Sequence, residues 1–141
     1  KKKREDEVQS LPISVVICAR DEEKNLEYFL PYILEQDYPD FEVVVVNDCS
    51  SDNTDILLDR MQKKYKHLKV TTIKKDEKFY HNKKLALTVG IKGAKNEWLL
   101  LTDADCKPES NSWLSSISSN FRNGTEVVLG YGGYFQEKGG Q

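Results

Sequence analysis

Short runs of β-branched and other apolar residues alternate with helical segments along most of the chain. The runs occupy residues 13–18, 41–46, 69–73 and 98–102, and the most apolar of them have the pattern of strands covered on both faces. Strands that alternate with helices favour a mostly parallel sheet, with right-handed crossovers that place helices on both faces. The sequence therefore predicts an α/β fold, in which ligands bind beyond the carboxyl ends of the strands.

Helical spacing and turn-forming residues predict the elements between these strands. After residue 23, apolar side chains at 26, 29, 30, 33 and 34 have the spacing of one helix face. Asp21 is the expected N-cap, Pro31 is expected to kink the helix, and residues 37–40 are expected to end it. Further helices are expected near 54–61, 83–92 and 113–121, followed by a strand at 127–129. The apolar or helix-face residues of the first and last of these are Ile56, Leu57, Arg60, Met61, Trp113, Leu114, Ile117 and Phe121.

The length of 141 residues corresponds to one domain or most of one. We expect a linker or disordered terminus at 1–11, a folded unit at 12–135, and a tail at 136–141. Five glycines between Gly130 and Gly140 lie near the end of the sequence, and we expect the domain to continue in the natural protein.

The net charge and the cysteine content limit the possible binding partners and the cellular compartment. The net charge of -2 gives no indication of nucleic acid as a partner. Residues 1–4 read KKKR, which is either a solvated terminus or a juxtamembrane segment of a membrane-anchored full-length protein. Three cysteines without metal-site spacing argue against a disulfide framework, and all three are interpreted as structural. We expect a protein of the cytoplasm or of the cytoplasmic face of the membrane.

The most informative polar residues are Asp103 and Asp105, which follow the buried run at 98–102. Residues i and i+2 of an extended backbone point the same way, so both carboxylates can face one ligand. Mg²⁺ or Mn²⁺ is commonly shared between one or two carboxylates and the phosphates of a substrate. The alternative is a turn in which Asp105 caps the segment that follows Pro108.

Other polar residues near the strand ends have a functional and a structural interpretation. Asp48 either contacts a base or ribose or forms a turn, in which Ser50 or Asp52 caps the next helix. Arg20 and Glu22 either line a site or form a surface ion pair. Lys83 and Lys84 lie where a helix is expected to start and are either solvated or within reach of a phosphate. His67 and His81 are interpreted as surface residues.

Taken together, these segments resemble family 2 glycosyltransferases of the GT-A fold over roughly residues 12–135. Four stretches carry the resemblance in order: ISVVICARDE at 13–22, VVNDCSSDNT at 45–54, KKLALTVGI at 83–91 and WLLLTDADCKP at 98–108. The resemblance implies a nucleotide-sugar donor, expected to be a UDP-sugar, a divalent cation, and transfer to a hydroxyl of an unidentified glycan or lipid-linked acceptor.

The resemblance also assigns roles to individual residues. It implies that Ala19, Arg20 and Glu22 line a uridine pocket and that Asp48 hydrogen-bonds the nucleobase. Lys83 corresponds to a lysine near the ribose and diphosphate, although Asn82 and Thr88 replace the glycine and asparagine that the family has around it. Asp103 is expected towards the ribose, and Asp105 is expected to hold Mn²⁺ or Mg²⁺ on the diphosphate.

Inverting members use a general-base Asp well downstream of this pair, so we expect the base beyond Gln141 and this chain alone to bind nucleotide without transferring sugar. Two other classes remain open. A nucleotidyltransferase usually has a Gly-rich basic loop after the first strand, whereas the first glycine here is Gly90. A receiver-like module would use Asp48 as its phosphorylation site but would leave Asp103 and Asp105 unexplained.

Overall fold

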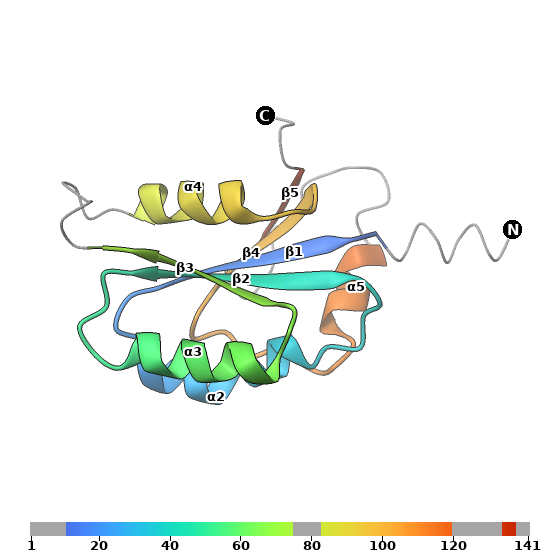
Figure 1. Ribbon diagram of the computed structural model, residues 1–141. Coiled ribbons are helices and arrows are strands. Elements are labelled where there is room, and N and C mark those ends of the chain that lie inside the picture. Colours follow the sequence, from blue (N-terminus) through green and yellow to red (C-terminus); the bar gives the residue numbers. More distant parts are fainter. Residues whose placement is uncertain (1–10, 75–82, 120–133, 138–141) are drawn as a thin grey trace, which may run out of the picture.

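A five-stranded sheet forms the centre of the structure, a computed structural model that describes residues 11–74, 83–119 and 134–137. The strands are β1 (Ile13–Ala19), β2 (Phe41–Asp48), β3 (Leu68–Ile73), β4 (Trp98–Asp103) and β5 (Tyr134–Glu137). The helices are α2 (Glu23–Leu34), α3 (Thr54–Lys64), α4 (Lys83–Gly93) and α5 (Trp113–Ser119). Figure 1 shows α4 on one face of the sheet and α2 and α3 on the other.

The strand order β3-β2-β1-β4-β5 places β1 between β2 and β4. β1 pairs in parallel with both neighbours, β2 pairs in parallel with β3, and β5 runs antiparallel to β4. The chain thus builds outward from β1 through β2 and β3, then crosses back to add β4 on the other side. The prediction of a mostly parallel sheet with helices on both faces is confirmed. The switch in strand order lies between β1 and β4, where open α/β sheets commonly bind ligands.

The larger core lies between the sheet and helices α2, α3 and α5. Val15 and Ile17 of β1 point into it, because alternate residues of a strand face the same side. They meet Leu26 and Leu30 of α2, which are 0% and 1% exposed, as the helical spacing predicted. Full burial of each such side chain contributes about 1.5–3 kcal/mol.

Helix α4 lies close to the opposite face of the sheet because Gly90 has no side chain. A Cβ atom at this position would lie 2.6 Å from Val16 Cγ1 and 2.9 Å from Val46 Cγ2. Ala86 and Ala94, near the two ends of the helix, are also small and buried. This close contact fixes the height of α4 above β1 and β2.

A polar network joins the amino ends of the three central strands. Glu42 of β2 is 5% exposed, and its Oε2 accepts hydrogen bonds from Ser14 Oγ and from the Lys95 backbone N–H, both at 2.6 Å. The Asn96 N–H donates to Ser14 Oγ at 3.2 Å, and Asn96 Nδ2 donates to the Ile13 carbonyl at 3.1 Å. A buried carboxylate is stable only with such partners, so this network ties the turn before β4 to β1 and β2.

One prediction about the helices differs from the structure. The N-cap position of α2 is held by Glu22 without a side-chain cap hydrogen bond, while Asp21 has a φ of 56° and binds a neighbouring loop, described below. Ile56 of α3 is 61% exposed, because Leu57 and Met61 form the buried face. Pro31 lies within α2, which continues to Leu34.

Some predictions fall at or beyond the limits of the description. The expected strand at 127–129, Phe121 and most of the N-terminal segment lie outside the described residues. β5 runs across the boundary expected at residue 135, and the division of the chain at 12 and 135 stays a prediction. Among the residues that the structure describes, no helix has the length and apolarity that crossing a bilayer requires.

Candidate nucleotide and metal site

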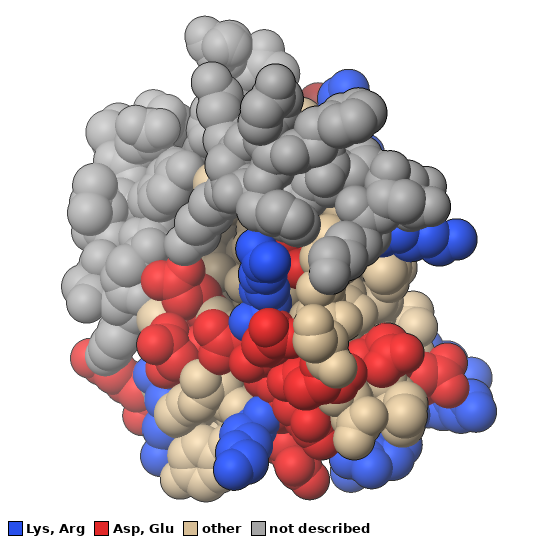
Figure 2. Space-filling view, turned by 90° about the vertical axis from the view of Figure 1, so that its left-hand side faces the viewer, with Lys and Arg blue, Asp and Glu red and all other residues tan. Residues whose placement is uncertain are grey.

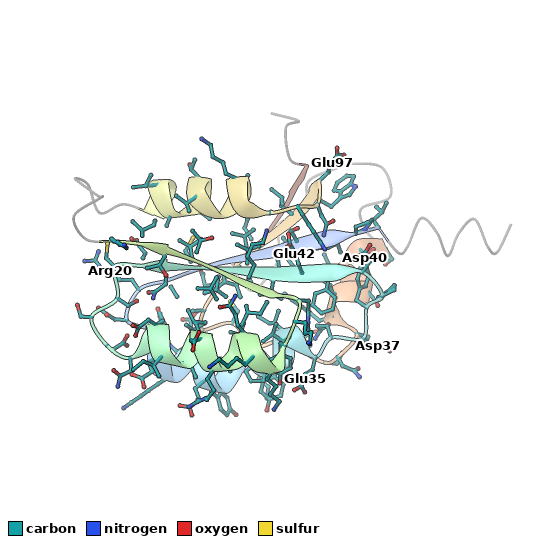
Figure 3. The ribbon with its side chains drawn as sticks, viewed as in Figure 1. Arg20, Glu35, Asp37, Asp40, Glu42 and Glu97 are labelled. Carbon is teal, nitrogen blue, oxygen red and sulfur yellow. The ribbon has the colours of Figure 1, made fainter. Side chains whose placement is uncertain are left out.

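The predicted site residues gather at the carboxyl ends of β1, β2 and β4. Strand register places Cys18 of β1 beside Asp103 of β4, and Ala19 of β1 beside Asn47 of β2. Arg20 lies just beyond β1 at this edge, whereas Glu42 lies within the sheet and Asp37, Asp40 and Glu97 lie towards the opposite end (Figure 3). The parallel arrangement therefore brings together residues that lie far apart in the sequence.

Asp48 and Asp103 lie on the face of the sheet that α4 covers. Val46, two residues before Asp48, packs against Ala86 of α4, and Leu101, two residues before Asp103, belongs to the cluster that Leu87 and Ile91 of α4 contact. Strand alternation gives both acids the same orientation. Lys83 is the first residue of α4, and Figure 1 shows this end of the helix at the carboxyl edge. The amino-terminal end of α4, which is the positive end of the helix dipole, thus lies on the same side as the two acids.

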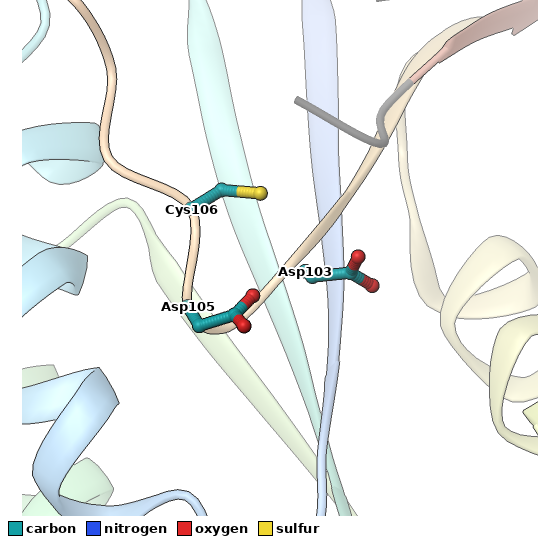
Figure 4. Close-up of side chains that lie close together, drawn as sticks. All are labelled: Asp103, Asp105 and Cys106. Carbon is teal, nitrogen blue, oxygen red and sulfur yellow. The ribbon is translucent and has the colours of Figure 1, made fainter. Parts of the chain in front are cut away.

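Asp103, Asp105 and Cys106 form a compact group of possible metal ligands. One ligand atom from each lies within 4.8 Å of the others. Figure 4 shows the three side chains around the turn that follows β4. The turn is closed by a hydrogen bond from the Cys106 N–H to the Asp103 carbonyl at 3.2 Å. The predicted carboxylate pair is therefore brought together, and the thiol of Cys106, a residue interpreted from the sequence as structural, lies beside it.

The residues predicted after β1 do not all face the same way. Ala19 is 2% exposed and belongs to the core beneath the sheet, on the face opposite α4, so its side chain faces away from Asp48. Arg20 is exposed. Glu22 Oε1 accepts a hydrogen bond from Asn25 Nδ2 at 2.7 Å. Salt bridges join Arg60 to Glu27 and Lys63 to Asp59. Within the described residues, no salt bridge joins Arg20 to Glu22, so the alternative interpretation as an ion pair is not observed.

The loops after β1 and β2 are joined by hydrogen bonds through Asp21. Its Oδ1 accepts the Ser51 N–H at 2.6 Å and the Asp52 N–H at 3.4 Å, and its own N–H donates to Ser50 Oγ at 3.0 Å. Cys49, between Asp48 and these residues, has a left-handed φ of 57°. Non-glycine residues with such backbone angles cluster at functional sites, where the surrounding structure holds them in place.

Asp52 connects the first turns of two helices. Its Oδ1 accepts the Thr54 backbone N–H at 3.1 Å and Thr54 Oγ1 at 2.5 Å, and its Oδ2 accepts the Glu23 N–H at 3.3 Å. Partial burial of the carboxyl raises its pKa, but the hydrogen bonds from Thr54 and Glu23 outweigh this effect and hold the pKa of Asp52 below its usual value. The N-cap of α3 is Asn53, without a side-chain cap hydrogen bond, so neither Ser50 nor Asp52 holds that position, and Asp52 binds the first helical residue, Thr54, from the position before it.

Acidic side chains dominate this edge of the molecule. Figure 2 shows a band of Asp and Glu side chains across it, with few lysines or arginines among them. The described loops and helix starts at this edge contribute Asp21, Glu22, Glu23, Asp52, Asp55, Asp103 and Asp105. A phosphorylated ligand is itself anionic, so it would be repelled from this edge unless a cation lay between the two. The donor set, two carboxylates with a nearby thiol, fits a divalent cation.

The strand order, the helices on both faces and the acid pair after β4 define an α/β fold of the GT-A type. The chain belongs to glycosyl transferase family 2, whose model matches residues 14–141. It is 31% identical over 93 residues to the poly-beta-1,6-N-acetyl-D-glucosamine synthase of Staphylococcus epidermidis, and the match covers 66% of this chain and 21% of that protein. Membership of this family confirms the resemblance and excludes the receiver-like alternative.

Solved structures of two glycosyltransferases have a similar fold. Residues 1–349 of TarS from S. aureus match with a TM-score of 0.67 and 27% identity, covering 80% of this chain and 33% of that one, and TarS has also been solved with UDP-GlcNAc. The mannosyltransferase PcManGT of Pyrobaculum calidifontis, solved with GDP-Man and Mn²⁺, matches with a TM-score of 0.68 and 29% identity, covering 77% and 32%. The chain thus spans about a third or less of each protein.

Proposed function

We propose that this chain forms the donor-binding part of a glycosyltransferase that takes a sugar from a nucleoside-diphosphate sugar, with UDP as the nucleotide. The observation that carries the proposal is the convergence of Asp48, Asp103 and Asp105 at the carboxyl edge beside β1. The site lies where an α/β sheet of this topology commonly binds its ligand. TarS, a similar fold at 27% identity, binds UDP-GlcNAc, which supports UDP.

In the proposed binding mode, residues at the ends of β1 and β2 contact the nucleobase, whereas residues at the end of β4 and the start of α4 contact the ribose and diphosphate. Asp48, 6% exposed at the end of β2, contacts the nucleobase, and Arg20 and Glu22 line the same part of the pocket. Asp103 faces the ribose, and Lys83 at the start of α4 lies towards the ribose and diphosphate. Ala19 contributes through its backbone, because its side chain is buried beneath the sheet.

A divalent cation, Mn²⁺ or Mg²⁺, is proposed to link the acids to the diphosphate. Asp105 and Asp103 would hold the ion, with the Cys106 thiol within reach. When bound, the cation neutralises the negative charge that develops on a leaving nucleoside diphosphate. Two features support this assignment: the acidic edge repels an anion that arrives without a cation, and the similar PcManGT was solved with Mn²⁺.

The reaction proposed for the full-length protein is transfer to an acceptor hydroxyl with inversion, as part of the synthesis of a cell-envelope polysaccharide. Two staphylococcal relatives, a poly-beta-1,6-N-acetyl-D-glucosamine synthase and a poly(ribitol-phosphate) beta-N-acetylglucosaminyltransferase, support the product class. We assign no general base to the residues of this chain. We further propose that the full-length protein acts at the cytoplasmic face of the membrane, which the basic segment at 1–4 would favour.

Calorimetric titration with UDP, with and without Mn²⁺, tests the proposal. We expect binding that requires Mn²⁺ and is lost in Asp105→Ala, because that variant removes a proposed metal ligand from an exposed turn without opening the core. Asp59→Ala, which removes an exposed carboxylate from α3, is the matched control and should bind as wild type. UDP binding that is unchanged without Mn²⁺ and in Asp105→Ala would contradict the metal assignment.

Nucleotide identity is tested in the same assay. GDP and dTDP are titrated under the same conditions, and UDP is expected to bind most tightly. Tighter binding of GDP would retain the metal site but overturn the choice of UDP. Failure of folded wild-type protein to bind any of the three nucleotides would contradict the proposed donor site in this chain.

A further inference from the structure

Asp21 has the most unusual set of contacts among the loop residues at the carboxyl edge. It follows β1 by two residues and is exposed, with a left-handed φ of 56°. An exposed aspartate in a loop ordinarily contacts solvent, but this one contacts three consecutive residues of another loop, Ser50, Ser51 and Asp52. Both its backbone N–H and its carboxylate take part, so the backbone and side chain of one residue hold the neighbouring loop.

The connection is reciprocal. In the other direction, the Asp52 carboxylate accepts a hydrogen bond from the Glu23 N–H at 3.3 Å, and Glu23 Oε1 accepts one from the Asn53 N–H at 3.2 Å. Carboxylates from each loop therefore bind backbone N–H groups of the other. Because these donors belong to the starts of α2 and α3, the contacts also satisfy N–H groups that a helix leaves without a partner.

This loop bridge, defined by Asp21, Glu23, Ser50, Ser51 and Asp52, lies between the residues proposed to contact the nucleotide. Arg20 and Glu22 flank Asp21 directly, and Asp48 precedes Ser50 by two residues. Fixing the two loops to each other therefore fixes Arg20 and Glu22 relative to Asp48. The sites of nucleotide contact lie on two separate loops, so without the bridge each would have to be ordered when the ligand binds, which weakens binding.

We propose that Asp21 is a positioning residue for the nucleotide, which sets the distance between the loop carrying Arg20 and Glu22 and the loop carrying Asp48. The inference rests on the proposed function, because it assigns those two loops to nucleotide binding. Asp21 itself does not touch the ligand in this proposal. Its hydrogen bonds all go to the loop after β2 and none goes to the proposed metal-binding turn after β4, so it affects nucleotide affinity and leaves the affinity for the metal alone unchanged.

Two substitutions at Asp21 distinguish the contribution of the carboxylate from that of the left-handed backbone angle. Asp21→Gly retains easy access to a left-handed φ but removes the acceptor. Asp21→Asn retains a side-chain oxygen and also tolerates this φ, but it removes the charge. Asp55→Asn removes the same charge from the exposed first turn of α3, where the carboxylate accepts only a local hydrogen bond from the Ile56 N–H at 2.9 Å, and serves as the electrostatic control.

Two measurements are made on the 141-residue chain and each variant. Calorimetry gives the affinity for UDP in saturating Mn²⁺, and proton relaxation enhancement gives the affinity for Mn²⁺ alone. Asp21→Gly should bind UDP about tenfold more weakly, the size expected from losing the side-chain acceptor whose hydrogen bonds order a loop. Asp21→Asn and Asp55→Asn should stay within about twofold of wild type, since each keeps the bridge and a single solvent-exposed charge contributes little.

Amide hydrogen exchange tests the loop bridge without any nucleotide. In Asp21→Gly, the amides of Ser51 and Asp52 should lose protection, while amides in β1 and β2 keep theirs. Unchanged protection would overturn the bridge, and unchanged UDP affinity with lost protection would overturn the positioning role. An Mn²⁺ affinity that falls in step with the UDP affinity would also overturn it, because the variant would then have disturbed the whole edge.

The two proposals fail in different ways. If the folded wild-type chain binds no nucleotide, the proposed function fails in the wild type itself, before any variant is compared, and the positioning role fails with it. If the wild type binds UDP and Asp21→Gly binds it equally well, the positioning role alone is wrong.

Discussion

Asp48 and Asp103 end the two strands that flank β1, and both side chains lie on the face of the sheet covered by α4. Ala19, at the end of β1 between them, faces the opposite side and is buried. A ligand that crosses the end of β1 on this face can therefore contact both carboxylates from one side, where Cys18 is the β1 side chain beside Asp103. The start of α4 closes that side.

Substitution of Asp48 should alter the choice of nucleobase. A carboxylate only accepts hydrogen bonds, so it favours the N3–H of uracil, whereas an amide can also donate to the N3 of cytosine. Asp48→Asn should therefore bind UDP more weakly and narrow the preference for UDP over CDP by about tenfold, the value of one good hydrogen bond. Competition calorimetry with the two nucleotides in saturating Mn²⁺ measures this preference, and an unchanged ratio would contradict the nucleobase role.

Occupancy of the acid pair should protect Cys106 from alkylation. Its ligand atom lies within 4.8 Å of those of Asp103 and Asp105, so a cation on the carboxylates restricts approach to the thiol. Mn²⁺ should slow the reaction of Cys106 with iodoacetamide, as followed by peptide mass mapping. The protection should disappear in Asp105→Ala. Equal rates with and without Mn²⁺ in the wild type would place the ion elsewhere.

Gly90→Ala should destabilise the fold. The added Cβ would lie 2.6 Å from Val16 Cγ1, and such overpacking costs about 1–3 kcal/mol, more than the roughly 1 kcal/mol that alanine contributes through helix propensity. Gly93→Ala is the matched control in the same helix, because its Cβ would meet Thr71 Oγ1 at an ordinary 3.7 Å. Urea unfolding should show a loss for the first variant and none for the second; equal effects would contradict the packing explanation.

Much of this fold is predictable from the apolar pattern, and the reason is visible in the strands. β1, β2 and β4 are buried on both faces, so apolar runs mark them, and the strand ends could be located to within two residues. The sequence also predicted the pairing of Asp103 with Asp105, because side chains two residues apart in an extended segment point in the same direction. An apolar residue in an amphipathic helix need not be buried, since Ile56 of α3 is 61% exposed.

The contacts between loops could not be predicted in the same way. Asp21 was assigned to the start of α2 because aspartate is a common N-cap, whereas its left-handed backbone directs the carboxylate to Ser51. That contact joins residues 30 positions apart and has no periodic signal in the sequence. The position of Cys106 beside the acid pair likewise depends on a turn that closes through Asp103. The sequence shows that these short turns are rich in acidic residues, but it does not show in which direction their side chains point.

Removal of the Glu42 side chain should weaken folding without affecting nucleotide binding. Glu42→Ala leaves Ser14 Oγ and the Lys95 N–H without their acceptor in a buried place, which costs about 1–3 kcal/mol. Glu97→Ala, a change near the same end of the sheet, is the control. Urea unfolding measures stability and calorimetry measures UDP affinity; a loss of affinity in still-folded Glu42→Ala would contradict the separation of the two ends.

Stability should depend on the ionisation of Asp52. Partial burial raises its pKa, but hydrogen bonds from Thr54 and Glu23 overcome that effect and lower it. Its contribution is therefore present above the unfolded value of about 3.9 and is lost as pH falls through the folded pKa. The difference in unfolding free energy between wild type and Asp52→Asn should be constant near pH 6 and shrink below about pH 4. A difference that is independent of pH would contradict this role.

The Glu42 network and the loop bridge occupy opposite ends of the same strands. Most of what holds β1, β2 and the turn before β4 together lies at the amino end and in the two cores, whereas the residues proposed to recognise the nucleotide lie in loops at the other end. Natural variation or laboratory selection can therefore exchange those loops over an unchanged frame. In a library randomised at Arg20, Glu22 and Asp48, folding and ligand preference can be optimised almost separately.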